Sequence, residues 1–196
     1  MVAEKEDLED ESFTIEAPVL VTERLVMRAP HESDIEDLAR LADNRRIAEM
    51  LVRLPHPYGE KDARAFLAMI NDGRGAGATY ALTLVESGTF IGVASLEPRR
   101  MGLELGYWVG EPYWGKGYAT EAAHALVDLG FRATDVGALH AACRVINPAS
   151  RRVIHKCGFQ YAGQGMSHSI VSGKVPVERY RLDRKTWVSL RTWRSV

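Results

Sequence analysis

The chain has 196 residues, of which 46% are hydrophobic, and a formal net charge of −1, which together predict one folded domain with a substantial core. The balanced charge argues against direct nucleic-acid binding, and no apolar run approaches the roughly 20 residues that span a bilayer. Two cysteines, Cys143 and Cys157, are too few for a disulfide scaffold and lack metal-ligand spacing, so we expect a metal-free protein of the reducing cytoplasm.

The N-terminus differs in composition from the rest of the chain. Six of its first twelve residues are acids and one is a lysine, which predicts a solvated tail. The remainder contains no linker, internal repeat or low-complexity segment. We therefore divide the chain into a flexible acidic tail, residues 1–14, and a single domain, residues 15–196.

The first half of the domain is predicted to be mostly helical. Val19–Ala29 alternates apolar and polar residues, as a half-buried strand does. Ser33 and Glu36 have capping-box spacing and lead into a helix whose apolar face carries Leu38 and Leu41. Two more helices, Arg45–Leu51 and Lys61–Ile70, and a mobile glycine-rich loop over residues 72–77 complete this half.

The hydrophobic period then changes from helical to strand-like. Strands are predicted over Thr79–Val85, Thr89–Leu96, Leu103–Val109, Leu139–Ile146, Phe159–Val171 and Val175–Leu182, with hairpins joining the first two and the last two. A helix over Glu121–Phe131 separates the strand Leu103–Val109 from the strand Leu139–Ile146, which predicts a βαβ-like crossing. The order indicates an α+β fold with a mixed, mostly antiparallel twisted sheet of about six to seven strands flanked by helices.

The turn before that helix has the composition of a phosphate site. Gly115 and Gly117 stand between an aromatic, β-branched strand and an Ala-rich helix start. Glycines allow a close backbone approach, and the free N–H groups of a helix N-terminus attract an anion. No P-loop string occurs, and a Rossmann fingerprint fails at Thr120, where its third glycine would stand. The turn therefore predicts a phosphorylated cofactor of another class.

A second motif spans residues 147–159. Asn147 can cap a helix, and Pro148 suits the first turn, where its missing N–H costs nothing. Gly158 ends this helix, and Phe159 begins the next strand.

Both motifs resemble those of the GNAT acetyltransferases. Trp114-Gly115-Lys116-Gly117-Tyr118-Ala119 is similar to the family's pyrophosphate turn, Gln/Arg-x-x-Gly-x-Gly/Ala, with Trp114 in place of the Gln or Arg. Residues 147–159 resemble Asn-x-x-Ser-x-x-x-x-x-Lys-x-Gly-Phe of the branch that contains the ribosomal-protein-alanine N-terminal acetyltransferases. Thr22–Arg28 resembles the family's first strand. The resemblance runs over about residues 19–187 and implies the GNAT fold.

The resemblance implies transfer of an acetyl group from acetyl-CoA to a primary amine by direct attack in a ternary complex. The turn would hold the pyrophosphate, the pantetheine arm would lie along the end of the fourth strand, at Trp108–Gly110, like an added strand, and an N–H near Val109 would stabilise the thioester oxygen. The coenzyme-binding residues that it implies are Trp108, Val109, Gly110, Trp114, Gly115, Lys116, Gly117, Tyr118, Ala119, Thr120, Asn147 and Ser150.

The resemblance also implies the catalytic groups. Ile154 occupies the position at which many superfamily members carry a tyrosine, so Ser150 is the candidate donor to the leaving thiolate. The alternative for Ser150 is an ordinary first-turn residue that bonds its own backbone. Glu104, on the strand that ends at the thioester, is the candidate base and would share a face with Gly106 and Trp108. His140 is the other candidate, and an α-amino acceptor needs no dedicated base.

The acceptor is the least determined part. It is a protein N-terminus or a small-molecule amine, with residues 45–57 and 168–176 lining its site and Arg53, Arg99 and Arg100 available to an acidic substrate. A non-catalytic acyl-CoA sensor or partner-binding module is the alternative function, and the retained Ser150 favours catalysis. A nucleotide-dependent oxidoreductase is disfavoured by the missing third glycine. The chain is expected to be a monomer or a homodimer.

Overall fold

The computed structural model describes residues 17–72 and 77–194. The predicted acidic tail, and residues 73–76 of the predicted mobile loop, lie outside them. The helices are η1 (Glu32–Asp34), α1 (Ile35–Ala42), α2 (Arg45–Ala48), α3 (Glu60–Asn71), η2 (Glu111–Tyr113), α4 (Tyr118–Ala133), α5 (Pro148–Lys156) and α6 (Arg184–Arg194). The strands are β1 (Leu20–Val21), β2 (Leu25–Arg28), β3 (Ala78–Leu84), β4 (Phe90–Arg99), β5 (Gly102–Val109), β6 (Ala138–Arg144), β7 (Gln160–Ser169) and β8 (Gly173–Asp183).

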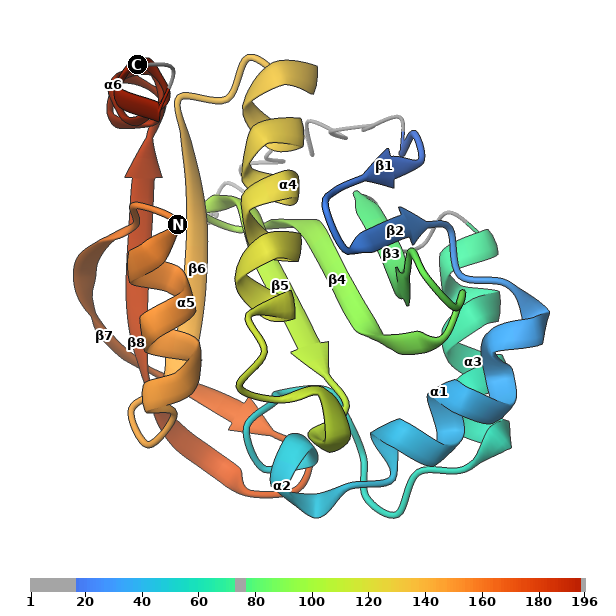
Figure 1. Ribbon diagram of the computed structural model, residues 1–196. Coiled ribbons are helices and arrows are strands. Elements are labelled where there is room, and N and C mark those ends of the chain that lie inside the picture. The colour runs from blue at the N-terminus through green and yellow to red at the C-terminus, as the bar shows by residue number, and fades with distance from the viewer. Residues whose placement is uncertain (1–16, 73–76, 195–196) are drawn as a thin grey trace, which may run out of the picture.

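The strands form one sheet in the order β1-β2-β3-β4-β5-β6-β8-β7 (Figure 1). Every neighbouring pair is antiparallel except β5 and β6, which are parallel and are joined through α4. The predicted α+β fold with a mixed, mostly antiparallel sheet is confirmed, and its described part contains eight strands rather than six or seven.

The additional strand comes from the segment predicted as one strand over Val19–Ala29. It is a tight hairpin, in which β1 pairs antiparallel with β2. The Thr22 hydroxyl accepts the Leu25 N–H at 3.1 Å, and the Thr22 N–H donates to the Leu25 carbonyl at 2.9 Å. An alternating pattern continues through such a turn unchanged, so the periodicity could not locate it.

The expectations for the helices are corrected at three points. The capping box is formed by His31 and Asp34, because Asp34 accepts the His31 N–H at 2.8 Å while the His31 ring accepts the Ser33 N–H at 3.3 Å. The predicted Ser33–Glu36 box is wrong, since a short 3₁₀ turn precedes α1. α6 was not expected, and α2 ends at Ala48, three residues before the predicted Leu51.

Two hydrophobic clusters cover opposite faces of the sheet and fix which way each side chain of β5 points. Leu103 and Leu105 pack into the cluster that includes α4 and α5. Trp108 packs against the other cluster, formed with α1 and α3. Because strand side chains alternate, Glu104 shares the Trp108 face, and Tyr107 shares the face of α4 and α5.

The sheet opens between β5 and β6. These parallel strands are in register at Glu104–His140 and at Leu105–Ala141, and over their described length no further pair is formed. The C-terminal end of β5 therefore has β4 on one side and no strand on the other. The chain enters both α4 and α5 at the end toward which the two strands separate (Figure 1).

Candidate active site

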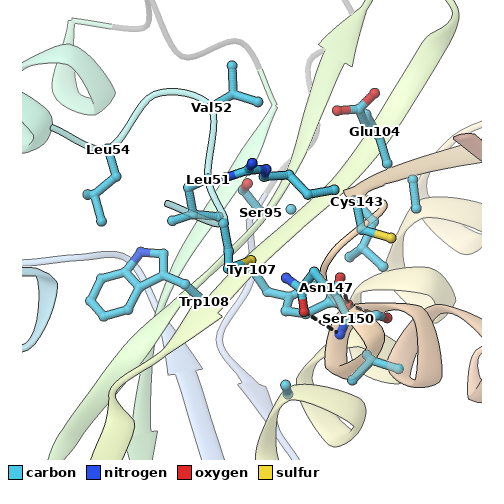
Figure 2. Close-up of a pocket in the computed structure, with 18 of the residues that line it drawn as sticks. Leu51, Val52, Leu54, Ser95, Glu104, Tyr107, Trp108, Cys143, Asn147 and Ser150 are labelled. Carbon is cyan, nitrogen blue, oxygen red and sulfur yellow. Dashed lines mark hydrogen bonds between the residues drawn. The ribbon is translucent and has the colours of Figure 1, made fainter. Parts of the chain in front are cut away.

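The opening between β5 and β6 continues into a cleft of about 2270 Å³. Its walls come from the ends of β5 and β6, the turn before α4, the first turn of α5 and the coil between α2 and α3. Figure 2 shows Cys143, Asn147 and Ser150 along one side of the pocket, and Leu51, Val52 and Leu54 along the other.

The backbone at the end of β5 faces this cleft. The Gly110 N–H donates to the Ile91 carbonyl of β4 at 2.8 Å. Since successive peptide groups of a strand point to opposite sides, the Val109 N–H and carbonyl point away from β4, into the opening. The carbonyl accepts a hydrogen bond of 2.6 Å from Nε1 of Trp114. The Val109 N–H is thus directed as an oxyanion donor in the cleft would be.

The glycine turn has the geometry of an anion site. Gly115 and Gly117 have φ of 75° and 86°, the left-handed region that glycine adopts without strain. Gly117 is the N-cap of α4 and supplies no side-chain cap, so the first N–H groups of the helix are left for another acceptor. The helix begins at Tyr118, three residues before the predicted Glu121, which brings the helix end directly onto the turn.

An ion pair from the N-terminal hairpin holds the turn in place. Arg24 donates through Nη1 to the Lys116 carbonyl at 2.8 Å and through Nε to the Glu121 carboxylate at 2.7 Å. The Thr22 hydroxyl donates to the same carboxylate at 2.6 Å. Burial raises the pKa of Glu121, but these hydrogen bonds outweigh that effect and hold the pKa below its ordinary value. Sequence reasoning predicted this segment as one strand and missed both the hairpin and its link to the turn.

A second link joins the turn to α2. Asn44 donates through Nδ2 to Glu111 at 2.7 Å, and Arg46 forms an ion pair with the same carboxylate. The Arg46 guanidinium also lies 4.9 Å from the centre of a Trp114 ring, within the range of a cation–π contact. Trp114 thus contacts both the Val109 carbonyl and the helix on the far side of the cleft.

Ser150 lies at the mouth of the opening. Asn147 caps α5, because its Oδ1 accepts the Ser150 N–H at 3.0 Å. The Ser150 hydroxyl lies 2.9 Å from the phenol oxygen of Tyr107, and burial raises the pKa of that phenol above its ordinary value. Sequence reasoning missed Tyr107. The sequence pattern could have indicated this residue, because alternation along β5 places Tyr107 on the face of α5 and Glu104 on the other face of the sheet.

Glu104 lies on the other face of the sheet. Burial raises the pKa of its carboxyl, the Glu97 charge adds to the effect, and Arg99 and Arg53 reduce it. Arg53 and Arg99 both form ion pairs with Glu97, so the structure engages these two arginines internally instead of leaving them for a substrate. Figure 2 shows Glu104 well separated from Ser150.

His140 is the neighbour of Glu104 across the parallel pair of strands. Burial, together with the Arg181 charge, lowers the pKa of His140. The imidazole is therefore neutral at neutral pH and can accept a proton. The register thus brings both candidate bases to one place on the face of the sheet opposite Ser150.

The cysteines are both buried free thiols, and burial raises the pKa of Cys143 to about 11. Across residues 17–72 and 77–194, no group of three or more His, Cys, Asp or Glu residues is arranged to hold a metal ion. Within the same ranges, every helix is too short or too polar to cross a membrane.

Comparison with known proteins places this geometry in a family. A family model described as an acetyltransferase (GNAT) domain matches residues 24–160. The uncharacterized N-acetyltransferase p20 of Bacillus licheniformis is 26% identical over 161 residues, which cover 80% of this chain and 90% of that protein. The ribosomal-protein-serine acetyltransferase of Escherichia coli K12 is 26% identical over 153 residues, 74% of this chain and 84% of that protein.

A solved structure shares the fold. RimL, a ribosomal α-N-protein acetyltransferase in complex with coenzyme A, matches with a TM-score of 0.72 and 23% identity over 84% of this chain and 97% of its own.

Proposed function

Since this chain belongs to the GNAT acetyltransferase family and is an acetyl-CoA-dependent acyltransferase, we propose that it acetylates a primary amine by direct attack in a ternary complex. The observation that carries the proposal is the uncapped start of α4, which follows two left-handed glycines beside the unpaired edge of β5. Together these features supply an anion site and a free strand edge within one cleft.

The chain's own groups fit acetyl-CoA from one end to the other. The N–H groups of residues 115–119 would hold the pyrophosphate, and the edge of β5 from Tyr107 to Val109 would bond the pantetheine amides. The Asn147 side-chain N–H₂ is a further donor toward the coenzyme, because its oxygen already caps α5. Acetyl-CoA supplies an activated acetyl group when bound, and the Val109 N–H would stabilise the charge that develops on the carbonyl oxygen.

Ser150 is the proposed donor to the departing thiolate. Its hydroxyl is held by the Tyr107 phenol instead of bonding its own helix. A hydroxyl fixed in this way stabilises the thiolate as the carbon–sulfur bond breaks, without giving up its proton. We therefore retain Ser150 as a catalytic residue and add Tyr107 as the residue that positions it.

Glu104 is the proposed base. A raised pKa brings a carboxylate closer to the operating pH, which favours proton transfer from an ammonium group through water. His140, neutral and in register with Glu104, is the alternative acceptor of that proton. In either case the amine loses one proton on the Glu104 face, its nitrogen attacks the acetyl carbon, and the second nitrogen proton passes to water or to the departing thiolate as the carbon–sulfur bond breaks.

The acceptor that we propose first is the α-amino group of a protein N-terminus. The activities named for the Escherichia coli relative and for RimL, both ribosomal-protein acetyltransferases, support this class. An α-amino group titrates at about pH 8, so about a tenth of it is already neutral at pH 7 and little base strength is required. Small-molecule amines are the second class.

Calorimetry with acetyl-CoA, followed by an amine panel with detection of the free thiol, tests the proposal. The panel contains peptides with free N-termini, the same peptides Nα-blocked with one lysine, a polyamine and an amino acid. Thiol release with the free N-termini alone supports the proposed acceptor, and release with another amine alone overturns it. Binding without turnover on any amine would replace catalysis by the sensor function, and absence of binding would refute the coenzyme site.

A further inference from the structure

The coil after α2 crosses the cleft on the Glu104 side. We name residues 49–54 the strap. The strap is bonded to the turn between β7 and β8, because the Ile170 N–H donates to the Val52 carbonyl at 3.0 Å and the buried Ser169 hydroxyl donates to the Leu51 carbonyl at 3.1 Å. The strap therefore joins the helical side of the cleft to its far hairpin.

Arg144 of β6 donates hydrogen bonds both to the strap and to the turn between β7 and β8. One nitrogen of its guanidinium, Nη1, donates to the Glu49 carbonyl at the start of the strap and to the Ser172 hydroxyl of the hairpin turn at 3.2 Å. The Ser172 N–H in turn donates to Ser169 at 3.2 Å. A single cation thus holds two segments that are far apart in sequence.

The half-buried Arg144 side chain has one donor that is not satisfied. Its Nε is buried and has no hydrogen-bond partner within the described part of the chain, and no carboxylate forms an ion pair with the guanidinium there. A buried N–H without a partner destabilises the folded state. The gain that offsets this cost is the bonding of the strap, since that is where the guanidinium donates.

Arg144 lies on the face of β6 opposite α5, so its effect on the acceptor can be distinguished from an effect on coenzyme binding. Alternation places Arg144 on the face of His140, whereas Cys143 lies on the face of α5. The strap consequently closes the side where the acceptor amine would meet Glu104. Asn147 and Ser150, on α5, do not contribute to the bonds that hold it.

We propose that Arg144 is a positioning residue for the acceptor: it fixes the strap across the cleft, so that the amine approaches Glu104 through a bounded channel and bulk water is kept from the acetyl group. This inference rests on the proposed acetyl transfer. In this inference the strap excludes water, and Arg144 holds the strap in place.

The test uses Arg144→Met, which keeps an apolar stem and removes every donor, and Arg144→Lys, which restores one charged donor. Arg132→Met, which removes an exposed arginine of α4 that does not line the cleft, is the matched control. For Arg144→Met we expect the acceptor KM to rise by about tenfold or more, since small misplacement lowers reactivity strongly. We also expect thiol release without acceptor to increase and acetyl-CoA affinity to change by less than about twofold.

Arg144→Lys should restore part of the acceptor KM, and Arg132→Met should behave as the wild type. Equal losses of coenzyme affinity and acceptor affinity would show a merely structural role and overturn the proposal. An unchanged acceptor KM would also overturn it.

Hydrogen exchange distinguishes failure of this inference from failure of the proposed function. The Ile170 amide donates to the strap, so Arg144→Met should accelerate its exchange even if no amine is ever acetylated. Unchanged protection of Ile170 would refute the anchoring role. Should Arg144→Met not fold, Ser172→Ala removes one partner of the guanidinium and is read out in the same way.

Discussion

The phenol oxygen of Tyr107 lies 2.9 Å from the hydroxyl oxygen of Ser150. Tyr107 belongs to β5, on one side of the opening in the sheet, and Ser150 belongs to α5, which follows β6 on the other side. The phenol oxygen also lies 3.2 Å from the Ser150 carbonyl oxygen, and a phenol proton donated to the Ser150 hydroxyl leaves the serine's own proton for the thiolate. One tyrosine thus contacts both the side chain and the backbone of the proposed thiolate donor, which fixes the hydroxyl before any coenzyme binds.

Replacing Tyr107 by Phe should lower turnover more than coenzyme affinity. A hydrogen bond contributes about 0.5–1.5 kcal/mol net, which corresponds to roughly twofold to tenfold in rate. Tyr80→Phe is the matched control, because the Tyr80 phenol is fully buried and has no hydrogen-bond partner in the described residues. Steady-state kinetics should show a lower kcat for Tyr107→Phe alone. Equal kcat values for both variants would contradict the positioning role.

Gly117→Ala should weaken acetyl-CoA binding. A Cβ at this position would be held at φ 86°, where a side chain costs about 1–2 kcal/mol. It would also lie 3.3 Å from Nη2 of Arg24, the residue that bonds the turn. Gly88, with φ 68° and no atom within 4 Å of the place that a Cβ would take, allows a control with the same backbone strain. Calorimetry should show reduced affinity for Gly117→Ala and wild-type affinity for Gly88→Ala; a similar loss in both would attribute the effect to strain alone.

Trp114→Phe should reduce kcat by roughly twofold to tenfold, the range expected for one lost hydrogen bond. The substitution removes the indole N–H that bonds the Val109 carbonyl at 2.6 Å while it retains an aromatic ring beneath Arg46. Trp187→Phe removes a comparable indole bond, of 2.7 Å to Asp128, far from the cleft. A kcat of Trp114→Phe equal to that of Trp187→Phe would show that the Val109 peptide needs no support from Trp114.

Local motifs predicted the part of the site that lies within short segments. The glycine turn, the Asn147 cap and the helix after it depend on neighbours in sequence, and all are found at or near the predicted positions. The Tyr107–Ser150 and Arg24–Lys116 bonds join residues 43 and 92 positions apart. Alternation assigns Tyr107 to the face of α5, but no periodicity or motif reports which residue it contacts there, because such pairs arise only when the sheet brings its strands together.

α6 illustrates the same limit for the fold. Its sequence has few apolar residues, and its start is held from outside the helix. Arg184 donates to the carbonyls of Phe131 and Val136 at 2.6 and 3.0 Å, near the end of α4. Tertiary contacts of this kind override weak local preference, so a pattern search along the chain passes over this helix.

Glu104→Gln should lower activity and raise stability at neutral pH, two effects of opposite sign from one carboxylate. Burial raises the pKa of Glu104 in the folded protein, so the folded state binds this proton more tightly than the unfolded state does. Stability is then lost as pH rises from the unfolded pKa through the raised folded pKa. Gln removes that loss, so the variant's Tm should exceed the wild-type value at pH 7 and approach it below about pH 4, where the carboxyl is protonated in both states.

For activity, the proton acceptor must be ionised, so the wild-type kcat/KM should fall as pH drops through the raised pKa, and this limb should disappear in Glu104→Gln. A base contributes roughly a hundredfold or more when the reaction depends on it. We expect the larger loss with a lysine side-chain amine, and a smaller loss with an α-amino acceptor, which is partly neutral already. If the acid limb persists in the variant, the proton acceptor is another group, and His140→Gln, tested over the same pH range, identifies or eliminates the neighbouring imidazole.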